Sequence, residues 1–202
     1  SCRDYVHYGF KECFIFYKDI HLFKNKIRKE MLSQREGLSE ERVISLSKAI
    51  AGKVNNLREF KEAKTVFCYI SKGKEVYTED IIMKSLYMNK KVIAPRVDEH
   101  KNKIVLHEIK SPGKDLSQGF RGISEPKSHL PVLDNLNKIN FAIIPGIAFD
   151  RKGRRIGFGK GFFDKLLSKK DLYPILCGIA FDFQITDNIP YFPHDICMDI
   201  IV

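Results

Sequence analysis

The sequence predicts an α/β fold with a single domain, in which helices flank a mostly parallel central sheet. Apolar runs of strand length alternate with amphipathic segments of helix length, and strand, helix and strand follow one another as in a parallel crossover. The chain has 202 residues, 44% hydrophobic and 30% charged, which is ordinary for a globular protein. This length fits one domain with a substantial buried core.

Two helices are predicted near the start of the chain. Residues 24–35, "KNKIRKEMLSQR", have helix-forming composition. For the next helix, Ser39 is a candidate N-cap, and Glu40 and Glu41 favour the first turn. Apolar residues then recur every three or four positions and form one stripe, namely Val43, Leu46, Ile50, Val54 and Leu57. Scattered charges before residue 23 interrupt any signal-peptide core. We therefore expect residues 1–23 to be an N-terminal extension of unknown role, and we expect residues 24–202 to be the domain.

A first crossover follows these helices. The apolar run 65–70, "TVFCYI", predicts a buried strand, and "SKGKE" predicts a loop. Thr78 is a candidate cap for a helix that carries Ile81, Ile82 and Leu86. "KVIAPRV" predicts the next strand, which stops near the proline because proline lacks a backbone N–H.

The second half of the chain gives weaker signals. Residues 103–109, "KIVLHEI", predict a strand, whereas residues 111–140 are rich in Gly, Pro, Ser and Asn and show no period. Residues 141–149, "FAIIPGIAF", predict a buried strand that runs into a loop, and a helix is expected at about 162–170. "YPILCGIAF" predicts a further strand, and "DIIV" closes the chain.

Charge and cysteine content narrow the possible partners and location. The 35 Lys and Arg residues exceed the 25 Asp and Glu residues, and the net charge of +10 favours anionic partners. Five cysteines without CxxC spacing argue against a disulfide framework and against a thiolate metal site. No apolar stretch reaches the length of a membrane span. We therefore expect a monomeric, cytoplasmic protein without membrane contact.

The stretch 154–164, "RRIGFGKGFFD", is the candidate ligand loop. Glycine at alternate positions leaves backbone N–H groups accessible, the following helix start adds partial positive charge, and Arg154, Arg155 and Lys160 add full charges. The spacing GxGxG matches neither the dinucleotide fingerprint nor the P-loop, so any metal needs another donor, for which Asp164 is the candidate. The alternative is that the glycines only join a strand to a helix.

Residues 143–167, "IIPGIAFDRKGRRIGFGKGFFDKLL", resemble the signature of the 5-formyltetrahydrofolate cyclo-ligase (methenyltetrahydrofolate synthetase) family. Five further stretches resemble motifs of this family in the same order: "KNKIR", "SKGKEVYTEDII", "APRV", "GFRGISEP" and "PHDICMD". The resemblance covers most of residues 24–202. It implies an ATP-dependent cyclo-ligase that acts on a reduced folate with ATP as co-substrate and Mg²⁺ as cofactor.

The implied reaction converts 5-formyltetrahydrofolate to 5,10-methenyltetrahydrofolate and releases ADP and phosphate. The formyl oxygen is phosphorylated, and intramolecular cyclisation then expels the phosphate. Such chemistry needs positioning and charge neutralisation more than a protein nucleophile.

The resemblance also implies roles for individual residues. The implied catalytic residues are Lys160 and Arg155, and the implied metal ligands are Asp164 and Asp195. The implied ATP-binding residues are Lys24, Arg28, Arg155, Ile156, Gly157, Phe158, Gly159, Lys160, Gly161, Phe162 and Phe163. The implied folate-binding residues are Arg28, Ile70, Glu75, Phe158, Gly159, Lys160, Gly161 and Phe162. Phe162 and Phe163 stand where the family usually has tyrosines, so they keep ring stacking but lose any phenol hydrogen bond.

An alternative to an enzyme remains: the chain could be a non-catalytic basic module that binds RNA or another polyanion. The net charge and the basic run 151–155 motivate it. Against it, no RRM, KH or zinc-finger pattern occurs, and the aromatic residues lie in apolar strands and not among the basic residues. We therefore expect no specific nucleic-acid partner. A third reading keeps the ATP site but uses a different acceptor.

Overall fold

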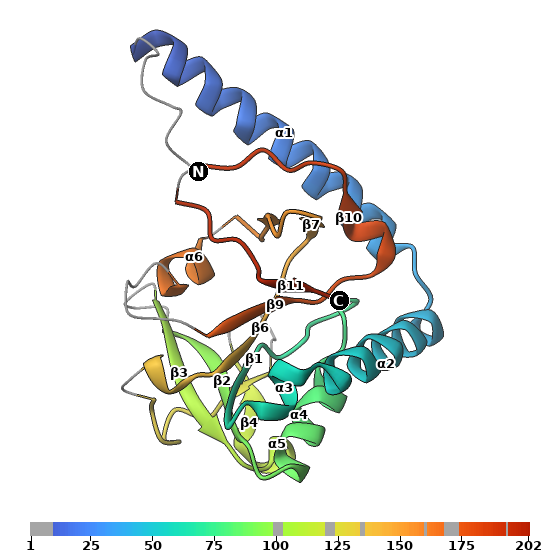
Figure 1. Cartoon of the computed structure of the whole chain (residues 1–202), viewed down its shortest axis with the longest axis vertical. Coiled ribbons are helices and arrows are strands. Elements are labelled where there is room, and N and C mark those ends of the chain that lie inside the picture. Colours follow the sequence, from blue (N-terminus) through green and yellow to red (C-terminus); the bar gives the residue numbers. More distant parts are fainter. Residues whose placement is uncertain are drawn as a thin grey trace.

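A computed structural model describes residues 10–98, 103–119, 124–133, 136–159, 161–167, 174–192 and 194–202. It confirms the predicted α/β fold with a mostly parallel central sheet (Figure 1). The six strands lie in the order β11 (Ile200–Ile201), β9 (Ile175–Gly178), β6 (Phe141–Ile144), β1 (Thr65–Cys68), β2 (Lys91–Asp98) and β3 (Lys103–Ile109). Four neighbouring pairs are parallel, and β2 and β3 are antiparallel.

The central strands are buried on both faces, as their continuous apolar sequences require. On one face, alternate residues such as Val66 and Val92 pack against α2 (Glu40–Asn56), α3 (Arg58–Glu62) and α4 (Glu79–Tyr87). On the other face, Phe67 and Ile93 pack with side chains of α6 (Phe162–Leu167). The strand period of two therefore divides the core into two layers. Ser39 caps α2 as predicted, with its hydroxyl accepting from the Arg42 N–H at 3.3 Å.

The long first helix, α1 (Phe10–Glu36), lies across the outside of this sandwich (Figure 1). The predicted helix at 24–35 is confirmed, but the helix begins much earlier and passes residue 23 without a break. Its buried residues recur every three or four positions at Ile20, Lys24, Ile27, Met31 and Arg35. This stripe is unusual because it includes two cations among apolar residues. The division at residue 23 stays a prediction.

The run 141–149 contains the predicted buried strand and the loop after it, but a second strand that we did not predict follows at once. β6 ends at Ile144, and Ala148–Asp150 forms β7 in a second, three-stranded sheet with β8 (Arg155–Ile156) and β10 (Ile185–Thr186). Between them, Pro145 has no N–H for a ladder, and a Cβ at Gly146 would lie 2.3 Å from the Phe149 ring. This break lets the chain leave the central sheet and turn toward α1.

Other expectations also need adjustment. β2 does not stop near Pro95 but continues to Asp98; β1 pairs with β2 only up to Ile93, so at the proline β2 has a neighbouring strand on one side alone. The segment without period contains α5 (Pro112–Asp115), a small sheet of β4 (Leu116–Gln118) and β5 (Ser124–Pro126), and the 3₁₀ turn η2 (Leu136–Lys138). Another 3₁₀ turn, η3 (Asp182–Gln184), precedes β10. Thr78 precedes α4, but its hydroxyl donates to the Tyr69 carbonyl and does not cap the helix. Of the helix expected at 162–170, the last three residues lie outside the described residues. None of the described helices has the length and apolarity that a membrane span requires.

Candidate active site

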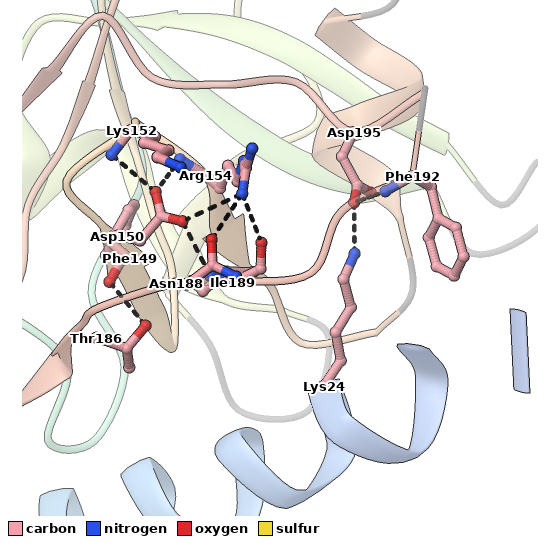
Figure 2. A network of polar contacts seen from close by, with 10 residues as sticks. All are labelled: Lys24, Phe149, Asp150, Lys152, Arg154, Thr186, Asn188, Ile189, Phe192 and Asp195. Carbon is pink, nitrogen blue, oxygen red and sulfur yellow. Dashed lines mark hydrogen bonds and ion pairs between the residues drawn. The ribbon is translucent and has the colours of Figure 1, made fainter. Parts of the chain in front are cut away.

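Lys24 on α1 contacts the C-terminal segment of the chain (Figure 2). Its ammonium forms an ion pair with Asp195 and lies 4.6 Å from the centroid of the Phe192 ring. The same Asp195 carboxylate accepts the Phe192 N–H at 2.8 Å, which holds the carboxylate in place. A predicted phosphate ligand and a predicted metal ligand thus lie in direct contact.

Arg28, one helical turn further along α1, contacts the glycine loop. Its Nε donates to the Gly157 carbonyl at 3.0 Å, and its Nη1 donates to Asn25. Its guanidinium carbon lies 3.9 Å from the position that a Cβ would take at Gly159. The structure therefore brings both predicted cations of α1 to the loop and to the segment around Asp195.

The glycine loop connects β8 to α6, and its backbone separates two possible roles of the glycines. Gly159 and Gly161 have φ angles of 94° and 64°, values that favour glycine. The turn from β8 to α6 is therefore enough to explain why glycine occupies these two positions. Gly157 has no positive φ, and a Cβ there would meet nothing within 4 Å, so neither strain nor crowding requires glycine. Within the described residues, no hydrogen bond occupies the main-chain N–H groups of Phe158 and Gly159. The loop can therefore present N–H donors to an anion.

Arg155 joins the two ends of this loop. Its buried guanidinium donates from Nη2 to Asp164 at 2.7 Å and from Nη1 to the Ile196 carbonyl at 3.0 Å. Asp164 lies in the first turn of α6, and Ile196 follows Asp195 in sequence. Arg155 therefore links both predicted metal ligands to the start of the loop.

The remaining predicted loop residues fall into three groups. Ile156 is buried in the small core under α1, so only its backbone lies in the loop. Phe158 is half exposed, whereas Phe163 packs edge-on against Phe67 with ring centroids 6.1 Å apart. Phe162 begins α6 and is partly buried. Lys160, a predicted catalytic residue, lies outside the described residues.

The donor set fits a magnesium ion that is shared with phosphates. Magnesium binds proteins through one or two carboxylates and completes its shell with water and phosphate oxygens. Asp164 and Asp195 supply such oxygens, although each is paired with a cation here. Across the described ranges, no three His, Cys, Asp or Glu side chains gather into a metal cage. A metal held by protein groups alone does not fit.

The predicted folate ligands Ile70 and Glu75 follow β1. Ile70 is partly buried at the edge of the larger core, and the Glu75 carboxylate accepts the Lys72 N–H at 2.9 Å. Burial raises the pKa of Glu75, an effect opposed by the Lys72 backbone hydrogen bond and the positive charge of Arg35. Arg35 also lies over the Phe158 ring, 5.7 Å from its centroid, and so neighbours both predicted folate-binding regions.

Sequence reasoning missed two residues of this region. Arg35 lies on the same helical stripe as Lys24 and Arg28, and this periodicity could have identified it. Asp150, which is fully buried, binds the loop after β7 to the segment near Ile189 (Figure 2). No sequence signal distinguishes its role, since the contact that joins two segments is made to the main-chain N–H of Ile189, far along the chain. An open hollow of about 570 Å³ beside β10 and β11 contains none of the predicted site residues.

Comparison with known proteins places these observations in one family. Residues 21–202 match the model of the 5-formyltetrahydrofolate cyclo-ligase family. A 5-formyltetrahydrofolate cyclo-ligase of Haemophilus influenzae is 29% identical over 170 residues, which cover 83% of this chain and 90% of that protein. A probable 5-formyltetrahydrofolate cyclo-ligase of Schizosaccharomyces pombe is 30% identical over 151 residues, or 73% of each chain. The structure of Aquifex aeolicus 5,10-methenyltetrahydrofolate synthetase aligns with a TM-score of 0.77 and 35% identity, covering 88% of both chains.

Proposed function

The chain belongs to the 5-formyltetrahydrofolate cyclo-ligase family, and we propose that it converts 5-formyltetrahydrofolate to 5,10-methenyltetrahydrofolate with ATP and Mg²⁺. The observation that carries this proposal is the contact between Arg28 and the Gly157 carbonyl, with Lys24 beside it on α1. It joins the cations of the first helix to a loop with accessible N–H groups. Two motifs far apart in sequence therefore form one anion-binding region.

The proposed reaction has two steps. The formyl oxygen attacks the terminal phosphorus of ATP, the bond from that phosphorus to the bridging oxygen breaks, and ADP leaves. The second folate nitrogen, N10, then attacks the activated formyl carbon. N10 gives up its proton, the carbon–oxygen bond breaks, and inorganic phosphate carries away the oxygen and the proton. Positioning and neutralisation of negative charge are the main demands of such a transfer.

The chain's own residues meet these demands in separate ways. Lys24, Arg28 and Arg155 supply positive charge on one side, and the N–H groups of Phe158 and Gly159 supply fixed dipoles. We extend this role to Lys160 by its place in the loop. Magnesium, when bound, neutralises phosphate charge, and Asp164 and Asp195 would hold it. The cations now paired with these carboxylates would then be released to contact phosphate oxygens.

The folate is proposed to lie on the Glu75 side of the loop. Glu75 can accept hydrogen bonds from the pterin N–H groups, and the half-exposed Phe158 ring can stack on the pterin. Phe163 is less suited to stacking on a ligand because it already packs against Phe67. ATP and a reduced folate are thus the proposed small-molecule partners. The monomeric state and the cytoplasmic location stay predictions.

The direct test is an assay with magnesium-ATP and 5-formyltetrahydrofolate. We expect ADP, phosphate and the absorbing methenyl product in equal amounts, and no product without ATP. Lys160→Ala is expected to abolish turnover without loss of fold, whereas Lys48→Ala, at an exposed position of α2, serves as the charge-matched control. Absence of product at saturating ATP would refute the proposal.

The structure gives the polyanion alternative little support. Within the basic run 151–155, Arg154 donates to Asn188 at 2.9 Å and stacks on Tyr191, while Arg155 is buried against Asp164. These two arginines serve internal contacts and do not form part of a basic surface stripe. Titration with a random oligonucleotide at two salt concentrations tests the alternative, which requires tight, steeply salt-dependent binding.

A further inference from the structure

Arg35, in the last turn of α1, is a buried cation whose side chain has no hydrogen-bond partner among the described residues. Its side chain is at the inner face of the helix and only 7% of the residue is exposed. Its Nε is buried, and neither a hydrogen bond nor an ion pair joins the Arg35 side chain to any residue in the described ranges. Burying a polar atom such as this Nε without a partner costs free energy, so a ligand that binds beside the guanidinium would meet unused donors there.

The neighbours of Arg35 are residues of the proposed folate region. Its guanidinium lies over the half-exposed Phe158 ring. Its charge also acts on Glu75, whose carboxylate is close enough to respond but forms no ion pair with Arg35 among the described contacts. The other nearby polar group, the Tyr69 hydroxyl, already donates to the Val76 carbonyl at 2.9 Å. The cation over this aromatic ring thus acts electrostatically on a carboxylate, and both charged groups keep unused hydrogen-bonding capacity within the described residues.

The proximity of Arg35 and Glu75 is fixed by another residue. Lys74, which precedes Glu75, donates from Nζ to the Leu38 carbonyl at 2.6 Å and to the Glu36 carbonyl. Glu36 is the last residue of α1 and Leu38 lies two residues beyond it, so Lys74 holds the loop of Glu75 against the end of the helix that carries Arg35. The carboxylate itself receives the Lys72 N–H as its one hydrogen bond within the described residues, which leaves its other oxygen available.

We propose that Arg35 is a substrate-binding residue that donates hydrogen bonds to the 4-oxo group of the pterin ring, next to Glu75. This inference rests on the proposed function. One edge of a 2-amino-4-oxopterin carries an amino group, a ring N–H and a carbonyl oxygen in a row. The Glu75 carboxylate can accept from the two donors, and the Arg35 guanidinium can donate to the carbonyl oxygen. Together they can bind this edge of the pterin in one orientation only. Phe158 would cover the ring face.

This arrangement makes Arg35 a specificity-determining residue. A pterin with an amino group in place of the 4-oxo group would turn a donor toward the guanidinium and leave the buried cation unpaired. Sites that hydrogen-bond a substrate group discriminate strongly against analogues that lack it. The chain should therefore prefer 5-formyltetrahydrofolate over its 4-amino counterpart. Arg35 should account for part of that preference and Glu75 for another part, because the 4-amino ring also lacks the ring N–H that faces the carboxylate.

The test measures binding of both compounds by titration calorimetry without ATP, for the wild type, Arg35→Met and Arg42→Met. Arg42 is exposed at the start of α2, so its variant matches the charge change. We expect Arg35→Met to weaken binding of 5-formyltetrahydrofolate by about 10- to 100-fold, the range for one charge-assisted hydrogen bond. The affinity for the 4-amino compound should fall much less, so the preference for 5-formyltetrahydrofolate should shrink. Arg42→Met should change the affinity for neither compound.

Stability separates this role from a structural one. Because Arg35→Met removes an unpaired buried polar group and keeps most of the volume, its unfolding temperature without ligand should stay the same or rise. A marked fall in this temperature with unchanged folate affinity would overturn the inference, and so would an equal loss of both compounds. If Arg35→Met does not fold, Arg35→Lys replaces it and should show the same reduced preference, because it lacks the planar fork.

Binding and turnover by the wild type test the proposed function, and the Arg35→Met variant tests the role of Arg35. Wild-type protein that binds neither compound would overturn the proposed function and this inference together. Wild-type protein that binds and turns over 5-formyltetrahydrofolate, with an Arg35→Met variant of equal affinity and preference, would overturn the inference alone.

Discussion

Asp150 and Asp195 lie in the same view of the molecule but are held in opposite ways (Figure 2). Asp150 is fully buried, and its two oxygens accept main-chain N–H groups of Lys152, Arg154 and Ile189 at 2.9 to 3.0 Å. Asp195 remains partly exposed and is held by the long side chain of Lys24 and by one main-chain N–H.

The difference between the two carboxylates distinguishes a group that stabilises the fold, Asp150, from a group that can exchange its partner, Asp195. Main-chain donors cannot leave Asp150 without unfolding the turn before β8 and the segment near Ile189. The Lys24 side chain, in contrast, can rotate away from Asp195 and meet a phosphate oxygen. A carboxylate with side-chain partners at a partly exposed position is thus suited to a ligand, and one with main-chain partners is suited to structure.

The largest effect should follow from removing the buried carboxylate. Asp150→Ala leaves three N–H groups without acceptors, and we expect a loss of about 3 to 5 kcal/mol in the free energy of unfolding. Urea denaturation followed by circular dichroism measures this. Asp195→Ala is the matched comparison, with a smaller expected loss of about 1 to 2 kcal/mol, because it removes the partner of the Lys24 ammonium and of one main-chain N–H at a partly exposed position. Equal losses would break the distinction between the two sites.

A converse pattern should appear in catalysis. We expect Asp164→Asn and Asp195→Asn each to lower kcat/KM by about 10²- to 10³-fold, the range for a group that neutralises charge in the transition state. Their unfolding midpoints should stay close to that of the wild type. Asp187→Asn, at an exposed position of the same C-terminal region, is the control. Near-normal turnover at saturating magnesium would remove both carboxylates from the proposed metal site.

The smallest effect concerns Glu75 and pH. Burial raises the pKa of Glu75, although the Lys72 backbone hydrogen bond and the charge of Arg35 oppose this, so the folded state binds the proton more tightly than the unfolded state. The contribution of Glu75 to stability is therefore fully present below its ordinary pKa of 4.5 and falls as the pH rises through the folded pKa. Glu75→Gln should lack this fall. The check is urea denaturation of both proteins from pH 4 to 8. A difference between the two proteins that stays constant with pH would contradict the burial argument.

Much of the fold could be predicted because its signals are local. The strand at Thr65–Cys68 is continuously apolar, and α2 carries a cap and a stripe, so each could be identified without knowledge of its neighbours. The break at Pro145 and Gly146 could not, because it depends on Phe149 filling the space beside Gly146. The short elements between residues 111 and 140 likewise depend on partners from elsewhere in the chain.

The candidate site divides in a similar manner. The glycine loop and Asp164 could be identified from the residues themselves, whereas Lys24 and Arg28 were identified only through the resemblance. These two cations alone are typical of a solvated helix face, and only the fold brings them to the glycine loop. Arg35 and Asp150 were missed because their roles lie in burial and in hydrogen bonds, or the lack of them, that no short motif records. Lys160 stays a prediction, since it lies outside the described residues.

The continuous course of α1 has a geometric consequence. The helix rises 1.5 Å per residue, so the cations at positions 24 and 35 are separated along its axis by roughly 16 Å. One continuous helix thereby sets the distance between the proposed phosphate contact at Lys24 and the proposed pterin contact at Arg35. Inserting a single residue between positions 24 and 35 would rotate one charge about a quarter-turn around the helix axis. The two proposed contacts could then no longer be made from the same face of the helix.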